Sequence, residues 1–251
     1  MRQGEGSKPR GRSPWAILAA LLLTGGLIYA QTVDDVLGNY YKAMGGKDKL
    51  SALQSLYMEG VSVRPDGNEV TSKIWKENKK AMRREVNSGM FSFTMILTDK
   101  EGWRTNPQAG GKFQPMEPEM VSGQQNELDI AGPLVDYAAK GHQVELQGQE
   151  DVNGKNCYKI HVTYASGRDG TYYIAPDTWY VVRFKAKGMG MRRPGGGNPD
   201  QEFVVDYSDF RKSDDGYVFP WQVTMAGMGG TTNYEKIEVN KAADPKLFKP
   251  E

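Results

Sequence analysis

Most of the chain alternates apolar and polar positions with a period of two, which is typical of half-buried β-strands. The alternation is clearest in residues 91–98 and 158–164, where every second residue is large and apolar. Turn sequences such as Asn153-Gly154 separate the segments. The pattern predicts a mainly β fold, with an antiparallel sheet of about 10 to 12 strands. The predicted strands cover 56–63, 70–75, 79–86, 91–98, 143–146, 157–164, 171–174, 179–187, 201–210, 217–225 and 231–239.

A helical period opens this part of the chain. Residues 33–44 carry apolar side chains at spacings of three and four, which form one stripe on a helix. Thr32 and Asp35 have the spacing of a capping box, and Gly45-Gly46 ends the pattern. Residues 48–53 extend it by a short second helical turn.

The strand pattern is interrupted once, by residues 106–140. Their first part is rich in proline and glycine and predicts a loop. We predict short helices over 119–126 and 127–140, with a break at Gly132-Pro133 and an apolar side that includes Leu134.

The number of strands exceeds what these helices can cover. A sheet of this size must curl or split, and its apolar face needs a partner. A curled sheet with helices across its opening leaves an apolar hollow. A fully packed two-layer sandwich fits the same alternation, so both arrangements stay open at this point.

The first thirty residues have the order of a secretory signal peptide. A basic start is followed by the apolar run that begins at Trp15, and by Ile28-Tyr29-Ala30 as a cleavage site. The segment from Trp15 to Ala30 is shorter than the roughly 20 residues that span a bilayer. We therefore predict a signal peptide over 1–30, a single exported domain over 31–251 and a periplasmic location. An uncleaved N-terminal membrane anchor is the alternative.

Composition argues against several functional classes. Removing residues 1–30 takes away four basic residues and one acidic residue, so the formal net charge falls from +1 to −2, which does not favour nucleic acid as a partner. Cys157 is the sole cysteine, so no internal disulfide can form, and its strand position predicts a packing role. Neither His142 nor His161 has a metal-ligand partner at a recognisable spacing, and no nucleophile elbow or phosphate loop is present. We therefore expect a monomeric protein that is not an enzyme and has neither a cofactor nor a metal site.

An ordered set of segments resembles exported bacterial proteins described as outer-membrane lipoprotein-sorting-protein-like, which are lipoprotein carriers and receptors of the LolA/LolB-like type. The set covers nearly all of residues 33–250, and no single segment is specific by itself. It consists of 33–50, the hairpin 153–160, 177–183, 206–210, Phe219-Pro220, 237–240 and 247–250.

The resemblance implies a half-barrel of antiparallel strands capped by short helices. The family's carriers hold acylated lipoproteins in a hydrophobic cavity, and relatives of the fold sense envelope lipoproteins. The carriers use an arginine on a cavity strand to control their closed state. Arg83, Arg84, Arg104 and Arg183 are the candidates for that arginine here.

Two groups of residues are therefore candidates for ligand binding. The predicted lining of an apolar cavity consists of Phe91, Phe93, Met95, Leu97, Leu134, Tyr158, Ile160 and Val162, although ordinary core packing explains the same pattern. The predicted rim loops carry Met189, Met191, Arg192, Met225 and Met228.

We interpret the chain as a carrier or receptor that sequesters a lipid-like ligand or a lipoprotein acyl chain. One alternative is an envelope protein-protein interaction or sensor module, with a packed core and docking through the Met/Gly-rich loops. Another is Cu(I) binding by the four loop methionines.

Overall fold

The computed structural model describes Met1 and residues 31–64, 67–89, 91–107, 110–187, 202–226 and 230–250. Residues Thr32–Glu251 form one compact unit, and the account below concerns that unit. The predicted signal segment lies outside the described residues and stays a prediction. Within the described part of the chain, no helix is both long enough and apolar enough to cross a membrane.

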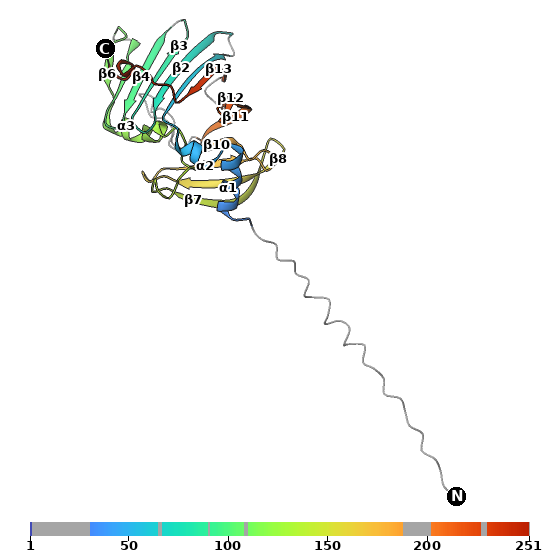
Figure 1. Cartoon of the computed structure of the whole chain (residues 1–251). Helices are drawn as coiled ribbons and strands as arrows, with labels where there is room; N and C mark the ends of the chain where they lie inside the picture. The colour runs from blue at the N-terminus through green and yellow to red at the C-terminus, as the bar shows by residue number, and fades with distance from the viewer. Residues whose placement is uncertain are drawn as a thin grey trace. The chain divides into compact units, whose positions relative to one another are not determined.

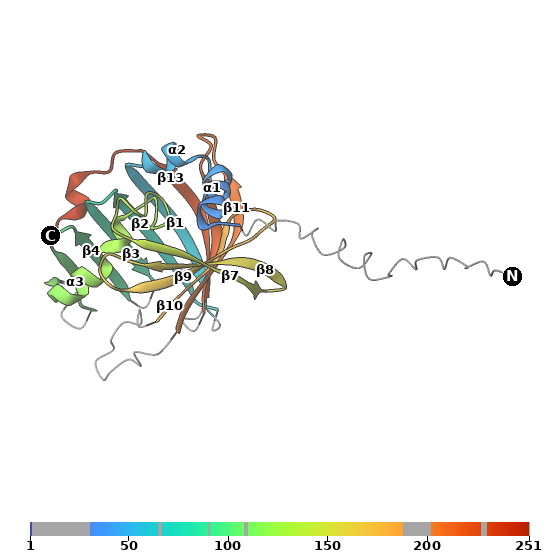
Figure 2. The ribbon, with the colours of Figure 1, turned by 90° about the horizontal axis from the view of Figure 1, so that it is seen from below.

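One antiparallel sheet of 13 strands organises the described residues (Figure 1). Its strand order is β6-β5-β4-β3-β2-β1-β13-β12-β11-β10-β9-β8-β7, so β1 pairs with β13 and the two edge strands β6 and β7 do not pair with each other. The sheet curls strongly (Figure 2), which confirms the predicted curled, unclosed antiparallel sheet. The strands are β1 (Ser55–Val63), β2 (Glu69–Glu77), β3 (Ala81–Asn87), β4 (Ser92–Thr98), β5 (Gly102–Thr105), β6 (Phe113–Pro115), β7 (Gln143–Val152), β8 (Lys155–Thr163), β9 (Asp169–Ile174), β10 (Val181–Lys187), β11 (Glu202–Lys212), β12 (Val218–Met225) and β13 (Gly230–Val239).

The turn sequences place most strands where the alternation predicts them. Asn153 and Gly154 have φ values of 53° and 82°, as a two-residue hairpin turn requires, and they join β7 to β8. Three predictions were wrong in detail. The strand predicted over 143–146 continues to Val152. β6 falls in the segment predicted to be a loop. β10 begins at Val181, since Trp179 has a φ of 61° and is not in the extended conformation of a regular strand.

The helical predictions hold at the start of the chain and fail in the middle. α1 (Val33–Ala43) has the predicted capping box between Thr32 and Asp35, and α2 (Lys47–Ser51) follows it. α3 (Pro118–Gln124) agrees with the predicted helix over 119–126. Two 3-10 turns, η3 (Gln125–Leu128) and η4 (Pro245–Phe248), also occur in the described part of the chain.

No helix forms over 127–140, in contrast to the prediction. After η3 the chain consists of turns up to residue 141. Gly132 and Asp136 have φ values of 77° and 53°, and Pro133 lacks the backbone N–H that a helix needs. Side chains hold this segment instead. The Lys140 ammonium lies 2.6 Å from Asp129 Oδ2, and the Tyr41 hydroxyl donates to the Leu134 carbonyl at 2.6 Å.

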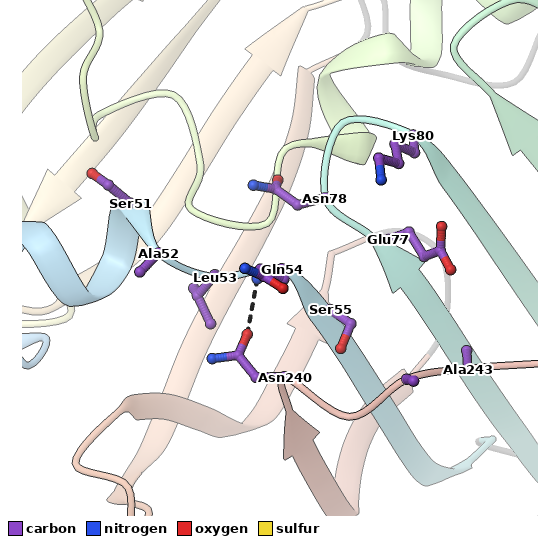
Figure 3. Close-up of a pocket in the computed structure, with 11 residues that line it drawn as sticks. Ser51, Ala52, Leu53, Gln54, Ser55, Glu77, Asn78, Lys80, Asn240 and Ala243 are labelled. Atoms are coloured by element: carbon purple, nitrogen blue, oxygen red, sulfur yellow. Dashed lines mark hydrogen bonds between the residues drawn. The ribbon is translucent and has the colours of Figure 1, made fainter.

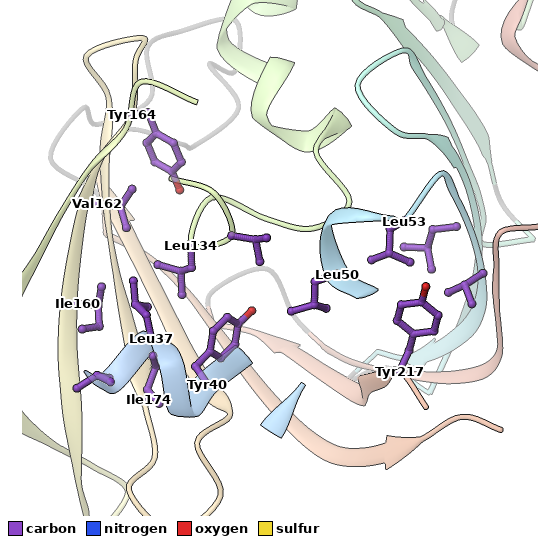
Figure 4. Packing of buried hydrophobic residues seen from close by; sticks show 14 residues of the cluster. Leu37, Tyr40, Leu50, Leu53, Leu134, Ile160, Val162, Tyr164, Ile174 and Tyr217 are labelled. Atoms are coloured by element: carbon purple, nitrogen blue, oxygen red, sulfur yellow. The ribbon is translucent and has the colours of Figure 1, made fainter. Parts of the chain in front are cut away.

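The strand register assigns each residue to one of the two faces of the sheet, because directly paired residues point to the same side. We call inner the face that packs against α1 and α3. On this face Leu97 shares a buried cluster with Val121 of α3, and Ile160 shares one with Leu37 of α1 (Figure 4). The opposite, outer face buries Cys157 in a smaller cluster with Tyr173, which confirms the predicted packing role of the cysteine.

Candidate ligand-binding site

The inner face has one end closed by helices and another built by hairpin tips. Leu37, Leu50 and Leu53 bring α1, α2 and the segment before β1 into a single buried cluster at the helix end (Figures 2 and 4). At the other end, β1 and β2 finish at the pair Val63–Glu69, and β12 and β13 finish at Met225–Gly230. We call this second end the hairpin end.

A set of aromatic side chains lies on the inner face between the regions that α1 and α3 cover. All four are half-buried and pack around the buried residues Phe184 and Val205. The Tyr172 ring lies 4.8 Å from the Phe184 ring, and the Tyr172 and Tyr164 hydroxyls are 2.6 Å apart. We call the set the aromatic strip, and it consists of Tyr172, Phe203, Tyr207 and Tyr234.

Two glycines allow these rings to lie close to the sheet. A Cβ on Gly60 would stand 2.9 Å from the Tyr234 ring and 2.8 Å from the Asn233 carbonyl oxygen. A Cβ on Gly170 would stand 2.6 Å from the Phe184 ring. Both distances are shorter than carbon atoms tolerate, so glycine is required at each position for the rings to stay in place.

The aromatic strip has an apolar environment although solvent reaches it. Burial raises the pKa of the Tyr172, Tyr207 and Tyr234 hydroxyls, and in each case loss of hydration is the largest cause. The same three residues are half-buried rather than fully covered. Side chains with both properties are typical of a concave apolar surface.

The predicted lining residues fall into three environments. Met95 and Leu97 are buried beneath α3 and η3, while Leu134, Ile160 and Val162 are buried in the cluster around α1. At these five positions side chains of the protein itself occupy the inner face.

The other three predicted lining residues are more accessible. Tyr158 is half-buried and stacks on Trp179, with ring centroids 5.3 Å apart. Phe93 is half-buried on the inner face of β4. Phe91 precedes β4 and is 40% exposed, with the Arg64 guanidinium 5.7 Å from its ring centroid. Whether any of these residues contacts a ligand stays a prediction.

The predicted rim is described only in part. Met225 ends β12 and is exposed. The hairpin β10–β11 ends at the pair Lys187–Glu202, and β11 also pairs with β12 through Val205 and Met225, so both methionine-containing connections leave the hairpin end of the sheet. The remaining rim positions, Met189, Met191, Arg192 and Met228, lie outside the described residues.

The register separates the four candidate arginines. Arg83 and Arg183 belong to the outer face, where they pair with Glu85 and with Asp206. Arg84 lies on the inner face, directly paired with Met95, and its Nη2 is 2.8 Å from Glu127 Oε2 of η3.

Two further bases share the inner face with Arg84. Arg104 is exposed, and it is the residue of β5 that pairs with Met95, on the strand opposite to Arg84. Lys76 is half-buried, and its Nζ donates to the Glu127 carbonyl oxygen at 2.6 Å. Burial lowers the pKa of the Lys76 ammonium to about 8.

Two pockets occur away from the aromatic strip. One, of about 490 Å³, lies at the helix end between Gln54, Glu77 and Asn240, and in it the Gln54 N–H donates to Asn240 Oδ1 at 2.8 Å (Figure 3). The other, of about 380 Å³, lies on the outer face beside Glu150 and Lys185. Within the described part of the chain, no group of three or more His, Cys, Asp and Glu side chains could hold a metal ion.

Sequence reasoning missed the aromatic strip. Its residues come from β9, β11 and β13, which alternation alone predicts to be strands. In the sheet order, β10 and β12 alternate with these strands, and the four aromatic side chains pack against the buried residues of β10, β11 and β12. Predicting which side chains lie together requires the order of the strands in the sheet, and the alternation of apolar and polar residues does not give that order.

Comparison with solved structures agrees with this architecture. A LolA superfamily protein of Nitrosomonas europaea superimposes with a TM-score of 0.53 at 10% sequence identity, over 87% of this chain and 97% of that chain. An outer membrane lipoprotein-sorting protein domain of Vibrio parahaemolyticus gives 0.48 at 11% identity, over 85% and 94% of the two chains. A DUF1329 family protein of Desulfovibrio piger gives 0.47 at 17% identity, over 85% and 97%. No family model and no curated protein matches the chain by sequence. The fold assignment rests on the first of these structures.

Proposed function

We propose that this protein, which has the fold of the LolA superfamily, is an exported carrier that sequesters the acyl chain of a lipid or a lipoprotein. The observation that supports this proposal is the aromatic strip, a half-exposed apolar surface on the concave side of a curled sheet. Binding of this kind involves no reaction, since the protein only removes an apolar chain from water. Export follows from the predicted signal segment over 1–30, and the resemblance to lipoprotein carriers supports the same role.

The energy of such binding comes from the hydrophobic effect. Each buried CH₂ group contributes about 0.8 kcal/mol, so a chain of about ten carbons gains roughly 8 kcal/mol before the cost of association. The half-buried Tyr207 and Tyr234 supply apolar ring faces, and their hydroxyls offer a polar contact at one edge. Useful affinity therefore needs no charged contact.

We call α3 and η3 the cover, because they bury part of the inner face beside the aromatic strip. Arg84 connects η3 to β3 through Glu127, and Arg168 of the β8–β9 turn donates a hydrogen bond to the Gly123 carbonyl of α3. These contacts join the cover to two strands that are far apart in the sheet order. We assign to Arg84 the role that the resemblance gives to the carriers' cavity arginine, which is to hold the closed state.

A pair of neighbouring substitutions tests the proposal. Phe203 and Val204 are both half-buried on β11, and they point to opposite faces because they are adjacent in a strand. We expect Phe203→Asp to abolish displacement of a fluorescent fatty-acyl probe, while Val204→Asp leaves it unchanged. Native mass spectrometry after gentle extraction should also show a bound apolar molecule. The carrier proposal fails if neither measurement detects an apolar ligand on the unmodified protein.

The partner-docking alternative depends on loops outside the described residues, and no described contact favours it. Deleting residues 189–197 separates the two hypotheses. A carrier keeps its acyl-probe binding after the deletion, because the aromatic strip belongs to the strands. A docking module loses its protein partner and shows no acyl-probe binding at any stage.

A further inference from the structure

The inner face of the six strands from β1 to β6 carries charges of one sign. Its charged residues are three bases, Lys76, Arg84 and Arg104, and no acidic residue of these strands points to this side. The outer face of the same strands mixes both signs. Its charged residues are Glu59, Glu69, Lys73, Glu77, Arg83 and Glu85.

The acidic groups of the neighbouring turns do not neutralise all three bases. Glu127 pairs with Arg84, and Asp129 pairs with Lys140 at 2.6 Å. Lys76 has a hydrogen bond to a backbone carbonyl but lies within ion-pair distance of no described carboxylate. Arg104 forms no side-chain hydrogen bond or ion pair with any described residue.

The strand register gives the spacing of the three bases on the inner face. Arg84 and Arg104 flank Met95 on neighbouring strands, so their Cα atoms are roughly 10 Å apart, which is two strand spacings. Lys76 pairs with Met82, two residues from Arg84 along β3. Lys76 and Arg104 are separated by three strand spacings and two residues, or roughly 16 Å between Cα atoms, so one group contacts both only when both side chains extend toward it past Arg84.

An apolar row runs beside the bases toward the aromatic strip. The row nearer the hairpin end consists of the paired positions Phe93, Val86, Ser72, Gly60 and Tyr234. It crosses the sheet over four strand spacings, or roughly 19 Å. It contains no charged residue, and the hydroxyl of its serine, Ser72, donates to the Gly60 carbonyl oxygen at 3.4 Å. The row leads from Phe93, beside Arg104, to Tyr234 of the aromatic strip.

We propose that the ligand is an amphiphile with an anionic head group, a carboxylate or a phosphate, which binds Lys76 and Arg104 while its chain follows the row from Phe93 to Tyr234. This inference rests on the proposed function and specifies its ligand class. Arg104 lies beside the Phe93 end of the row, and Lys76 lies on β2 four residues from Ser72, so both charges are displaced toward the helix end of the sheet. A molecule with a charge at one end of an apolar chain matches this separation of charge from the row. Anions paired with lysine and arginine form charge-assisted hydrogen bonds, which are stronger than neutral ones.

The test compares three ligands with the same chain on the purified full-length protein at pH 7. Hexadecanoate, hexadecyl phosphate and hexadecanol each displace a neutral fluorescent acyl probe. We expect the two anions to act at about tenfold lower concentration than the alcohol, the effect of one charge-assisted contact. Inorganic phosphate alone should not displace the probe, because it lacks the chain.

Variants locate the effect. Arg104→Gln and Lys76→Gln should each raise the concentration at which the two anions displace the probe by about fivefold to tenfold, and should leave that of hexadecanol unchanged. Arg104→Lys should restore part of the lost anion affinity. Lys73→Gln, a change on the outer face of β2, should leave probe displacement by all three ligands unchanged.

The outcomes separate this inference from the proposed function. Equal displacement by all three ligands, or an equal loss for the alcohol in Arg104→Gln, overturns the anionic head group and leaves an acyl carrier. Absence of binding for all three overturns both proposals.

Discussion

Replacing Lys76 with methionine should stabilise the protein at neutral pH. The Lys76 ammonium lies against η3 on the inner face, where burial lowers its pKa to about 8 from an ordinary value near 10.5. Glu127 and Asp129 favour its charge, while Arg84 opposes it, and loss of hydration outweighs all three. The charged form is therefore less stable in the folded protein than in the unfolded chain.

The magnitude follows from the shift of the pKa. A difference of 2.5 units corresponds to about 3 kcal/mol against folding when the group is charged in both states. Loss of the hydrogen bond to the Glu127 carbonyl in Lys76→Met reduces this gain in stability by about 1 kcal/mol. Solvent screening reduces the remaining gain further, because Lys76 is only half-buried. We expect Lys76→Met to raise the free energy of unfolding by about 1 to 2 kcal/mol at pH 7.

The sign of the pH dependence is fixed. Below pH 8 the group is protonated in both states, and the full cost is present. Between pH 8 and about 10.5 the unfolded chain binds more protons than the folded protein, so the stability of the unmodified protein rises with pH. The advantage of Lys76→Met should therefore shrink across that interval.

Urea unfolding at pH 7 and at pH 10 measures both effects, with Lys73→Met as the control. Lys73 lies on the outer face of the same strand and pairs with Glu59 at 3.0 Å in contact with water, so its replacement should change stability by less than about 1 kcal/mol. A lower stability of Lys76→Met at pH 7, or a gain that does not fall by pH 10, would refute the reasoning.

Three further predictions concern the cover, the sheet and the first helix. Arg84→Gln removes the ion pair with Glu127, so amide hydrogen exchange over residues 118–130 should accelerate while exchange in β7–β9 stays unchanged. Gly170→Ala places a methyl group against the Phe184 ring and should lower the free energy of unfolding by about 1 to 3 kcal/mol, whereas Gly154→Ala in the open β7–β8 turn tests the cost of a positive φ alone. Thr32→Ala removes the capping box of α1 and should cost about 1 kcal/mol in thermal unfolding, and an unchanged melting temperature would contradict the cap's role.

Much of this fold is local and could be predicted from the sequence. Strand alternation depends only on which side chains enter the core, and turns such as Asn153-Gly154 depend only on residues that accept a positive φ. The segment 127–140 shows where the method fails. Its apolar residues have a helical spacing, but Gly132-Pro133 and the contacts of Asp129 and Leu134 with distant groups favour a series of turns.

The candidate site was predictable only in part, for a related reason. The sequence identifies Phe93, Ile160 and Val162 as inward-facing residues, but it does not show that α1 covers the last two and leaves the first half-exposed. The aromatic strip and the three bases become visible only when the register places residues of separate strands on the same face. These are properties of strand order, which alternation does not specify.

The bases of the inner face connect the stability prediction to the ligand prediction. A half-buried ammonium whose charge weakens the fold is expected at a functional site, where a stability cost is retained in return for binding. An anionic ligand at 100 times its dissociation constant stabilises the folded state by about 2.7 kcal/mol, which exceeds the expected gain from Lys76→Met. If Lys76 contributes to that affinity, saturating hexadecanoate should stabilise the unmodified protein more than it stabilises Lys76→Met. The difference between the two proteins should then shrink or change sign when the ligand is added. An equal shift of both unfolding curves would show that Lys76 has no part in binding.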